Sequence, residues 1–317
     1  TAKVERAGGV VFEGHDAANL GNPELVVTTA AANDDNPEIA EARRRGIPVI
    51  LRAEMVARLM EGKRVIAVAG SHGKTTTSSL IAFILREAGR RPKYLLGGES
   101  IDLDGHAAWG EGELCVVEAD EYKRAFHEYA PAVAVITNVE PDHLDYYGTA
   151  EAYQEAFVEF GRRIIEGGRL VACWDDPGAQ HAAQMVEDRA VRIESYGIEG
   201  SSFWRAENIR RDAAGATFDL FRAGLPIGEL RLPLPGDHFI RDAVAAAAVC
   251  LGEGVLFGQI AGALANVHGA HRRFERKGEA NGITVMDSYA HHPTEARADI
   301  EASRTAFPGR RLIVVYQ

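Results

Sequence analysis

The chain has 317 residues, of which 46% are hydrophobic and 26% charged, a size that suggests two or three domains and a balance typical of soluble proteins. The net charge of −11 disfavours binding to nucleic acid or to anionic membranes, and no apolar run is long enough to cross a bilayer. The first six residues are not followed by the apolar stretch of a signal peptide. We therefore predict a cytoplasmic enzyme with no nucleic-acid or membrane partner; the sequence does not indicate its oligomeric state.

The cysteines exclude two kinds of architecture. They stand alone and are odd in number, with neither metal-ligand spacing nor a disulfide framework. We predict that all three are small core residues: Cys115, Cys173 and Cys250.

The first sixty residues alternate between short strands and helices. Strands are predicted at 24–29 and 48–51, with a helix at 37–45 between them that Gly46 closes. This is α/β organisation, but the strand and glycine-rich turn that normally open a nucleotide-binding α/β domain do not precede it. We expect residues 1–62 to be an incomplete N-terminal domain.

The region 63–268 predicts a doubly wound parallel sheet with a small antiparallel sheet appended to it. The near-continuous apolar run at 64–69 is typical of a central parallel strand, and period-two stretches over 203–232 indicate the antiparallel part. Further elements are predicted as strands at 114–118, 132–137, 169–173 and 191–196, and as helices at 74–87, 150–166 and 237–251.

A third unit is predicted from residue 269 to residue 317. It contains a strand at 283–286, a helix at 293–306 and a strand at 311–315. Because no helix follows the last strand to cover it, we expect this C-terminal α/β domain to be incomplete as well.

The strongest chemical signal is a glycine-rich loop between the strand at 64–69 and the helix at 74–87. Such a loop points backbone N–H groups into one cavity, and the helix N-terminus adds positive potential. The lysine can reach the β- and γ-phosphates and the hydroxyl after it can bind Mg²⁺. The usual phosphate-binding loop has a glycine where Val68 stands, so this is a shortened variant, formed by Gly70, Ser71, His72, Gly73, Lys74, Thr75 and Thr76.

Carboxylates follow two further predicted strands. Glu118, Asp120 and Glu121 end one strand at the edge where open α/β sheets bind ligands. Glu118, still on the strand, is favoured as a metal ligand, whereas Asp120 or Glu121 could instead be an acidic start to the next helix. His143 lies among three carboxylates after the next strand and is an equally weighted candidate for metal ligand or solvated loop residue.

These segments together resemble the Mur ligases. The motifs, in order, are GSHGKTTT, VVEADE, TNVEPDHLD, PLPGDH, HRRFE and MDSYAHHPTE, and they cover essentially the whole chain. The loop His72 and the run from His291 to Glu295 favour the branch that adds L-alanine to UDP-N-acetylmuramate. The early segment from Gly14 to Leu20, which includes His15, also looks like the N-terminal domain of that branch.

The resemblance implies the fold, the reaction and a set of residue roles. It implies three α/β domains that use ATP and Mg²⁺ to join L-alanine to the lactyl carboxylate of UDP-N-acetylmuramate through an acyl phosphate, in peptidoglycan precursor synthesis. The loop would bind ATP. The other implied roles are catalysis for Lys74 and His143; metal binding for Thr75, Glu118 and His143; ATP contacts for Arg273 and Asp287; sugar-nucleotide contacts for His15 and Asn138; and amino-acid contacts for Tyr289, His291 and His292.

The sequence departs from the family pattern in two places. The usual His-Asn-x-x-Asn near adenine reads His238 to Asp242 here, so we expect His238 or Asp242 to take over that role. The usual Asp-Asp-Tyr reads Asp287-Ser288-Tyr289, with the first aspartate kept.

Three other functions compete with this one. A ligase that attaches a whole tripeptide to the same sugar nucleotide shares most motifs, but usually carries an insertion where residues 123–132 run straight to the next strand. A P-loop ATPase or GTPase would need the longer glycine loop, and a GTPase also a guanine signature that is missing. A non-catalytic nucleotide-binding protein would bind ATP without turnover.

Overall fold

A computed structural model describes residues 2–186 and 190–316. The chain divides into two compact units, Thr1–Glu61 and Gly62–Gln317, and each is described by itself. The predicted boundary between residues 268 and 269 lies inside the second unit and stays a prediction. None of the helices in the described part of the chain is both long and apolar enough to span a membrane.

The first unit is a small α/β fragment around two parallel strands. Residues 26–28 pair with 49–51, as expected for strands joined by a crossover helix, and Asn36 caps that helix by accepting from the N–H of Glu38. Its elements are α1 (Ala2–Arg6), η1 (Ala17–Leu20), β1 (Val26–Thr28), α2 (Pro37–Arg44), β2 (Val49–Leu51) and α3 (Arg52–Leu59).

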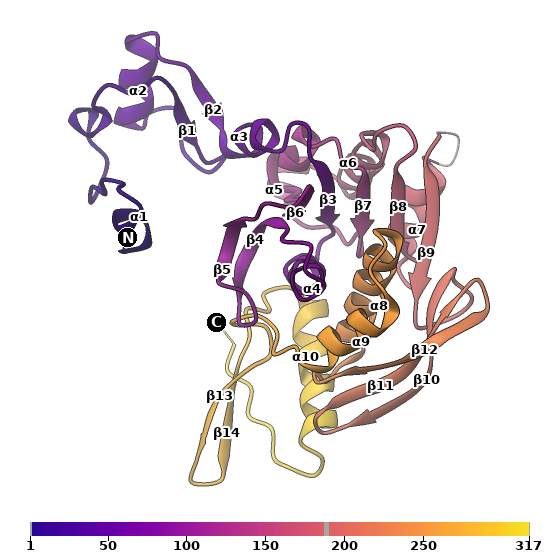
Figure 1. The fold of residues 1–317 in the computed structure, drawn as a ribbon. Coiled ribbons are helices and arrows are strands. Elements are labelled where there is room, and N and C mark those ends of the chain that lie inside the picture. The colour runs from indigo at the N-terminus through magenta and orange to yellow at the C-terminus, as the bar shows by residue number, and fades with distance from the viewer. Residues whose placement is uncertain (1, 187–189, 317) are drawn as a thin grey trace. The chain divides into compact units, whose positions relative to one another are not determined.

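The second unit is built on one mixed sheet of ten strands in the order β12-β11-β10-β9-β8-β7-β3-β6-β4-β5 (Figure 1). The strands from β9 to β4 in this order run parallel, and β5, β11 and β12 are antiparallel to their neighbours. The predicted antiparallel part therefore continues the parallel sheet through the parallel pair of β9 and β10. The strands are β3 (Arg64–Ala69), β4 (Lys93–Ser100), β5 (Gly105–Trp109), β6 (Leu114–Glu118), β7 (Val133–Ile136), β8 (Arg169–Cys173), β9 (Arg192–Gly197), β10 (Trp204–Asp212), β11 (Gly215–Arg222) and β12 (Leu225–Leu232).

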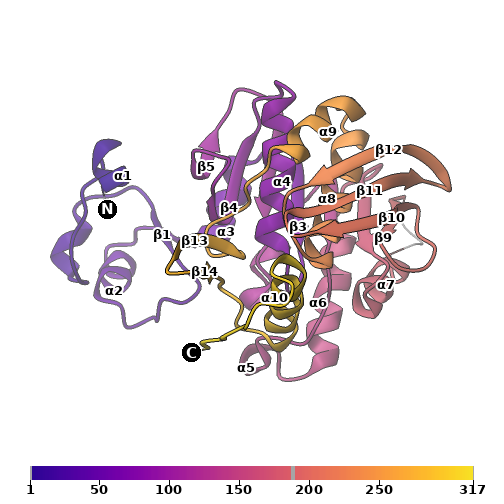
Figure 2. The same cartoon turned by 90° about the horizontal axis from the view of Figure 1, so that it is seen from below.

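Helices cover both faces of this sheet, with α4, α8 and α9 on one side and α5, α6 and α7 on the other (Figure 2). The alanine-rich stretch 243–248 of α8 is fully buried, and its small side chains let α8 pack closely on α4. The cysteine prediction is confirmed, since all three are buried and free. The helical elements are α4 (Lys74–Glu87), η2 (Tyr122–Glu128), α5 (Leu144–Tyr147), α6 (Ala150–Arg162), α7 (Pro177–Gln184), α8 (Asp237–Gly252) and α9 (Phe257–Ala265).

Residues 275–306 form a hairpin and one helix. The hairpin pairs β13 (Glu275–Ala280) with β14 (Ile283–Asp287), and α10 (Pro293–Ala306) packs on α8 and β10. The predicted strand at 311–315 is wrong: residues 311–316 have no strand structure, because no described strand pairs with them. Their apolar alternation is real, but a strand needs a neighbour to satisfy its backbone groups.

Candidate functional site

The glycine-rich loop leaves β3 at Gly70 and reaches α4 at Lys74, at the edge where β3, β6 and β7 end. Gly70 and Gly73 have φ values of 145° and 78°, conformations that favour glycine. A Cβ on Gly70 would lie 1.9 Å from Oγ1 of Thr137, and one on Gly73 would lie 2.7 Å from Oδ1 of Asp242. The two glycines therefore let the loop lie directly against the end of β7 and the first turns of α8.

Asn138, which follows β7, holds the loop in place with its side-chain amide. Its Oδ1 accepts from the N–H of His72 at 2.8 Å, and its Nδ2 donates to the carbonyl of His72 at 3.0 Å. The N–H of Ser71 also donates to the Asn138 carbonyl, at 3.2 Å. Asn138 thus acts as a scaffold for the loop, and its role towards a sugar nucleotide stays a prediction.

Lys74 makes a buried ion pair with Glu121. Its Nζ lies 3.0 Å from Oε1 and 2.9 Å from Oε2 of Glu121, and it also donates to the carbonyl of Ser71 at 3.2 Å. Burial works to lower the pKa of Lys74, but the carboxylates of Glu121 and Glu118 outweigh it and raise that pKa. Lys74 is therefore held as a cation inside the loop.

The ion pair resolves an alternative that the sequence left open, since Asp120 is the carboxylate that accepts from the N–H of Tyr122 at the start of the next helix and Glu121 is the one that turns to Lys74. Glu121 precedes the 3-10 helix η2, but its side chain makes no cap hydrogen bond there and is only 2% exposed. The only available signal was the run of three carboxylates at the end of β6, which does not say which one turns towards Lys74.

Thr75 and Glu118 provide oxygen atoms that fit Mg²⁺. The Thr75 hydroxyl donates to Oε2 of Glu118 at 2.8 Å, and the N–H of Gly97 donates to the same oxygen at 2.7 Å. A side chain at Gly97 would collide with this carboxylate, since its Cβ would lie 2.4 Å from Oε1. Hydroxyl and carboxylate oxygens are the donors that Mg²⁺ prefers beside nucleotide phosphates, so the predicted pair is brought together in a suitable form.

His143 lies apart from that pair in its contacts. It is the left-handed N-cap of α5, with φ of 51°, and its ring packs 5.0 Å from the ring of Tyr122. Its Nε2 lies 3.9 Å from Oδ2 of Asp142, and no hydrogen bond or ion pair within the described ranges joins it to Glu118. Its metal-binding and catalytic roles stay predictions.

A cavity of about 260 Å³ opens beside the loop, between the ends of the strands, the start of α8 and the segment from Arg273 to Asp299. Its charged lining includes Arg273, whose Nη1 lies 3.4 Å from Oε1 of Glu295. Glu295 in turn lies 3.4 Å from Nδ1 of the loop residue His72. The cavity is therefore bounded by the phosphate loop on one side and by α10 on the other.

His238 and Asp242, the first and last residues of the segment that departs from the family pattern, both line this cavity. Asp242 is buried and accepts from the Thr77 hydroxyl at 2.9 Å, and burial raises its pKa to about 7. Burial also lowers the pKa of His238 to about 4. The cavity thus has a neutral imidazole at the position of the family's histidine, and an easily protonated carboxyl where the family pattern has its second asparagine.

The other predicted residues occupy varied positions. Asp287 ends β14 and does not line the cavity, whereas its neighbour Ser288 does. The Tyr289 ring lies 4.5 Å from the guanidinium of Arg272 and 5.6 Å from that of Arg273. The remaining three are His291, exposed before α10; His292, the N-cap of α10; and His15, in the first unit, with its Nδ1 3.3 Å from Oε1 of Glu38.

Three family models match consecutive parts of the chain. They are described as the Mur ligase family, catalytic domain, over residues 1–64; the Mur ligase middle domain, over 68–250; and the Mur ligase, glutamate ligase domain, over 272–317. The middle-domain match alone covers more than half of the chain and includes the whole phosphate loop.

Curated relatives agree with these matches. The UDP-N-acetylmuramate–L-alanine ligase of Roseiflexus sp. (strain RS-1) is 46% identical, over all of this chain and 71% of that relative. The ligase of the same name from Myxococcus xanthus is 43% identical, over all of this chain and 66% of that protein. The chain thus spans about two thirds of the length of these relatives.

Solved structures give the same fold. The UDP-N-acetylmuramate-alanine ligase of Thermotoga maritima has a TM-score of 0.85 and 31% identity, covering 97% of this chain and 70% of that one. A murein peptide ligase from Psychrobacter arcticus has a TM-score of 0.81 and 27% identity, covering 98% and 69%. The fold is therefore shared by enzymes that differ in the group they attach.

Proposed function

Because this chain belongs to the Mur ligase family, we propose that it serves the ATP-dependent ligation of L-alanine to UDP-N-acetylmuramate in peptidoglycan precursor synthesis. The observation that carries the proposal is the arrangement of Lys74, Thr75 and Glu118: a buried cation and a hydroxyl–carboxylate pair converge on one glycine-rich loop. The names of the relatives support the choice of L-alanine.

The reaction needs a carboxylate to attack a polyanionic phosphate. In the proposed sequence the lactyl carboxylate attacks the γ-phosphorus of ATP and ADP leaves. The amine of L-alanine then attacks the resulting acyl phosphate, phosphate leaves, and the nitrogen loses a proton as the amide forms. The developing negative charge has to be offset, and a preorganised cation in a site shielded from water does this efficiently. Lys74, already charged and buried, would turn from Glu121 towards the phosphate oxygens.

Mg²⁺ would supply further charge neutralisation at the β- and γ-phosphates, held by Thr75 and Glu118. Glu118 is oriented for this by the N–H of Gly97. We keep His143 as a proposed further metal ligand; it would have to turn its ring away from Tyr122.

The remaining residue roles are proposed from the resemblance. Arg273 borders the cavity and would contact ATP. The others are Asp287 at the ATP ribose, His15 and Asn138 at the sugar nucleotide, and Tyr289, His291 and His292 at the amino acid.

Because both nucleotide substrates are cytoplasmic metabolites, we also propose a cytoplasmic location.

The tripeptide-attaching ligase is kept as a second candidate, because solved murein peptide ligases share this fold. A phosphate-release assay on the complete protein, with ATP, Mg²⁺ and UDP-N-acetylmuramate, separates the two. We expect release with L-alanine and at most a few per cent of that rate with the tripeptide. The reverse ranking would establish the second candidate, and ATP binding without release in either arm would favour a non-catalytic role.

A further inference from the structure

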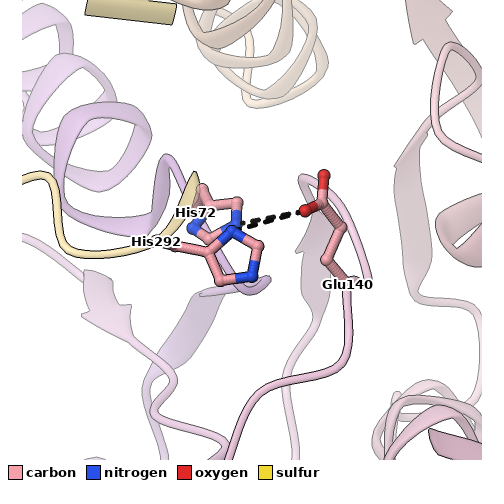
Figure 3. A group of neighbouring side chains, drawn as sticks. All are labelled: His72, Glu140 and His292. Atoms are coloured by element: carbon pink, nitrogen blue, oxygen red, sulfur yellow. Dashed lines mark ion pairs between the residues drawn. The ribbon is translucent and has the colours of Figure 1, made fainter. Parts of the chain in front are cut away.

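Three side chains from distant parts of the sequence meet at the outer side of the phosphate loop: His72, Glu140 and His292 (Figure 3). His72 belongs to the loop itself, Glu140 follows β7, and His292 caps α10. Each offers one ligand atom, and these atoms all lie within 4.8 Å of one another. In the parts of the chain that the structure describes, no other group of three histidine, cysteine or acidic side chains is gathered in this way.

The imidazole of His72 has no hydrogen-bond partner among the residues that the structure describes. Both ring nitrogens are buried and lack a hydrogen bond of normal geometry, each has only a loose contact with a carboxylate, and the side chain is only 11% exposed. The nearby carboxylate oxygens, of Glu140 at 3.6 Å and Glu295 at 3.4 Å, are too distant or poorly aligned for a hydrogen bond. Buried polar atoms are seldom left without a partner, so this ring indicates a partner of another kind.

The spacing of the cluster suits a metal ion. A tetrahedral ion with ligands at about 2.0–2.1 Å separates its ligand atoms by roughly 3.3–3.4 Å. In the structure, Oε2 of Glu140 lies 3.6 Å from Nε2 of His72 and 3.5 Å from Nδ1 of His292. The ligand atoms of His72 and His292 lie within 4.8 Å of each other, so side-chain rotation would have to bring the three atoms to the spacing of an ion's ligands.

The surroundings of Glu140 also resemble a metal site. The Thr294 hydroxyl donates to Oε2 of Glu140 at 2.6 Å, and such contacts commonly orient a ligating carboxylate. His292 Nδ1 accepts from the Thr294 N–H at 3.3 Å, a long bond that an ion would displace. The other half of this capping box would remain, because Oε2 of Glu295 accepts from the N–H of His292 at 3.4 Å.

We propose that His72, Glu140 and His292 form a binding site for a divalent transition-metal ion of the zinc type. Two imidazoles and one carboxylate, with a fourth position left open, are a ligand set of that class. Mg²⁺ prefers oxygen ligands in octahedral geometry, so the site differs in chemistry from the one at Thr75 and Glu118. An ion here would tie the phosphate loop to α10 and restrain both.

Calorimetric titration of the complete, tag-free, metal-depleted protein with Zn²⁺ alone tests this proposal. We expect one equivalent to bind and the unfolding temperature to rise with it. His292→Ala and Glu140→Gln should each weaken the Kd for Zn²⁺ at least tenfold, as loss of one ligand requires. Co²⁺ gives a second readout, because its visible absorption reports tetrahedral nitrogen and oxygen ligands and should fall in both variants.

Two matched controls make the result specific. His291→Ala removes an adjacent, 60% exposed imidazole that is not in the cluster, and should leave the Kd unchanged. Glu118→Gln, which removes the proposed Mg²⁺ carboxylate, should also leave Zn²⁺ binding unchanged, so failure of the ligase proposal and failure of this one are distinguishable.

Absence of stoichiometric Zn²⁺ binding would overturn the proposal. So would equal affinity in all variants that still show cooperative thermal unfolding, or displacement of Zn²⁺ by millimolar Mg²⁺, since nitrogen ligands discriminate strongly against Mg²⁺.

Discussion

The phosphate loop has an inner side, which faces β6 and carries Lys74, and an outer side, which faces α10 and carries His72. The two residues are close in sequence but differ strongly in their contacts. Lys74 is 15% exposed and His72 is 11% exposed. Lys74 has three hydrogen bonds and an ion pair at 2.9 Å, whereas the His72 ring has no hydrogen bond to the described residues and only looser contacts with Glu140 at 3.6 Å and Glu295 at 3.4 Å. Lys74 faces Glu121, which follows the adjacent strand β6. His72 faces α10, more than two hundred residues later in the chain. One side is complete within the parallel sheet, and the other depends on the C-terminal segment.

Lys74→Ala, which removes the cation of the inner side, should have the largest effect of the variants considered. Loss of the cation should lower turnover in the complete protein by on the order of 10²–10³-fold, about 3–4 kcal/mol of transition-state stabilisation. It would also leave Glu121 buried and unpaired, so the unfolding temperature should fall. Adding Glu121→Gln should restore the unfolding temperature but not turnover; near-normal turnover of Lys74→Ala would refute the role of the lysine.

Glu118→Gln tests whether the inner side of the loop binds Mg²⁺. The amide can still accept from the Thr75 hydroxyl, but it lacks the charge, so turnover should fall by roughly 10²-fold and half-saturation should need more Mg²⁺. A Mg²⁺ titration of the phosphate-release rate measures both. Glu111→Gln, which alters an exposed carboxylate paired with Arg91, should change neither, and an unaltered Mg²⁺ requirement in Glu118→Gln would exclude this ligand.

Asp242 is a buried carboxyl beside the loop for which no ion pair with a described residue is found, and the effect of burial on its pKa outweighs the charges of Arg241 and Arg273. Burial raises the pKa of this carboxyl from 3.8 to about 7, so ionisation opposes folding increasingly from about pH 4 to pH 7 and fully above that. Asp242→Asn should therefore stabilise the protein by on the order of 2 kcal/mol at pH 8 and have little effect near pH 4.5. Thermal unfolding at the two pH values measures this, and a pH-independent difference would contradict the raised pKa.

Glu295→Gln should have the smallest effect of these variants, because it only weakens the contacts between α10 and the outer side of the loop. It removes the charge that faces both Arg273 and His72, at a cost of about 1 kcal/mol. Amide hydrogen exchange in the first turn of α10 should become faster, while the core strand β3 stays protected. Glu301→Gln, at an exposed position of the same helix, serves as the control; equal exchange in the two variants would show that Glu295 does not hold α10.

Local sequence patterns predicted the residues of the inner side well, because these residues lie at the ends of neighbouring strands in the sheet. The apolar run 64–69 and the helix at 74–87 coincide with β3 and α4, since a buried parallel strand and a glycine-started helix leave strong local signals. Thr75 and Glu118 could be paired in advance because the carboxyl ends of adjacent parallel strands share one edge.

Elements that depend on pairing were harder to predict. The strands β4, β5 and β13 were missed, and residues 311–316 alternate like a strand without forming one. A segment forms a strand only where it can pair with the free edge of another strand, and that strand can be far away in the sequence.

The sequence by itself determined the α/β class, the phosphate loop and the identity of most candidate site residues, because these depend on periodicity, glycine and short-range order. Only the tertiary structure decided that Glu121 rather than Asp120 holds Lys74, that Asn138 supports the loop, and that His72 meets Glu140 and His292. Burial and long-range contact settle those choices, since the chemistry of a carboxylate or an imidazole depends on what the folded chain places within a few ångströms of it.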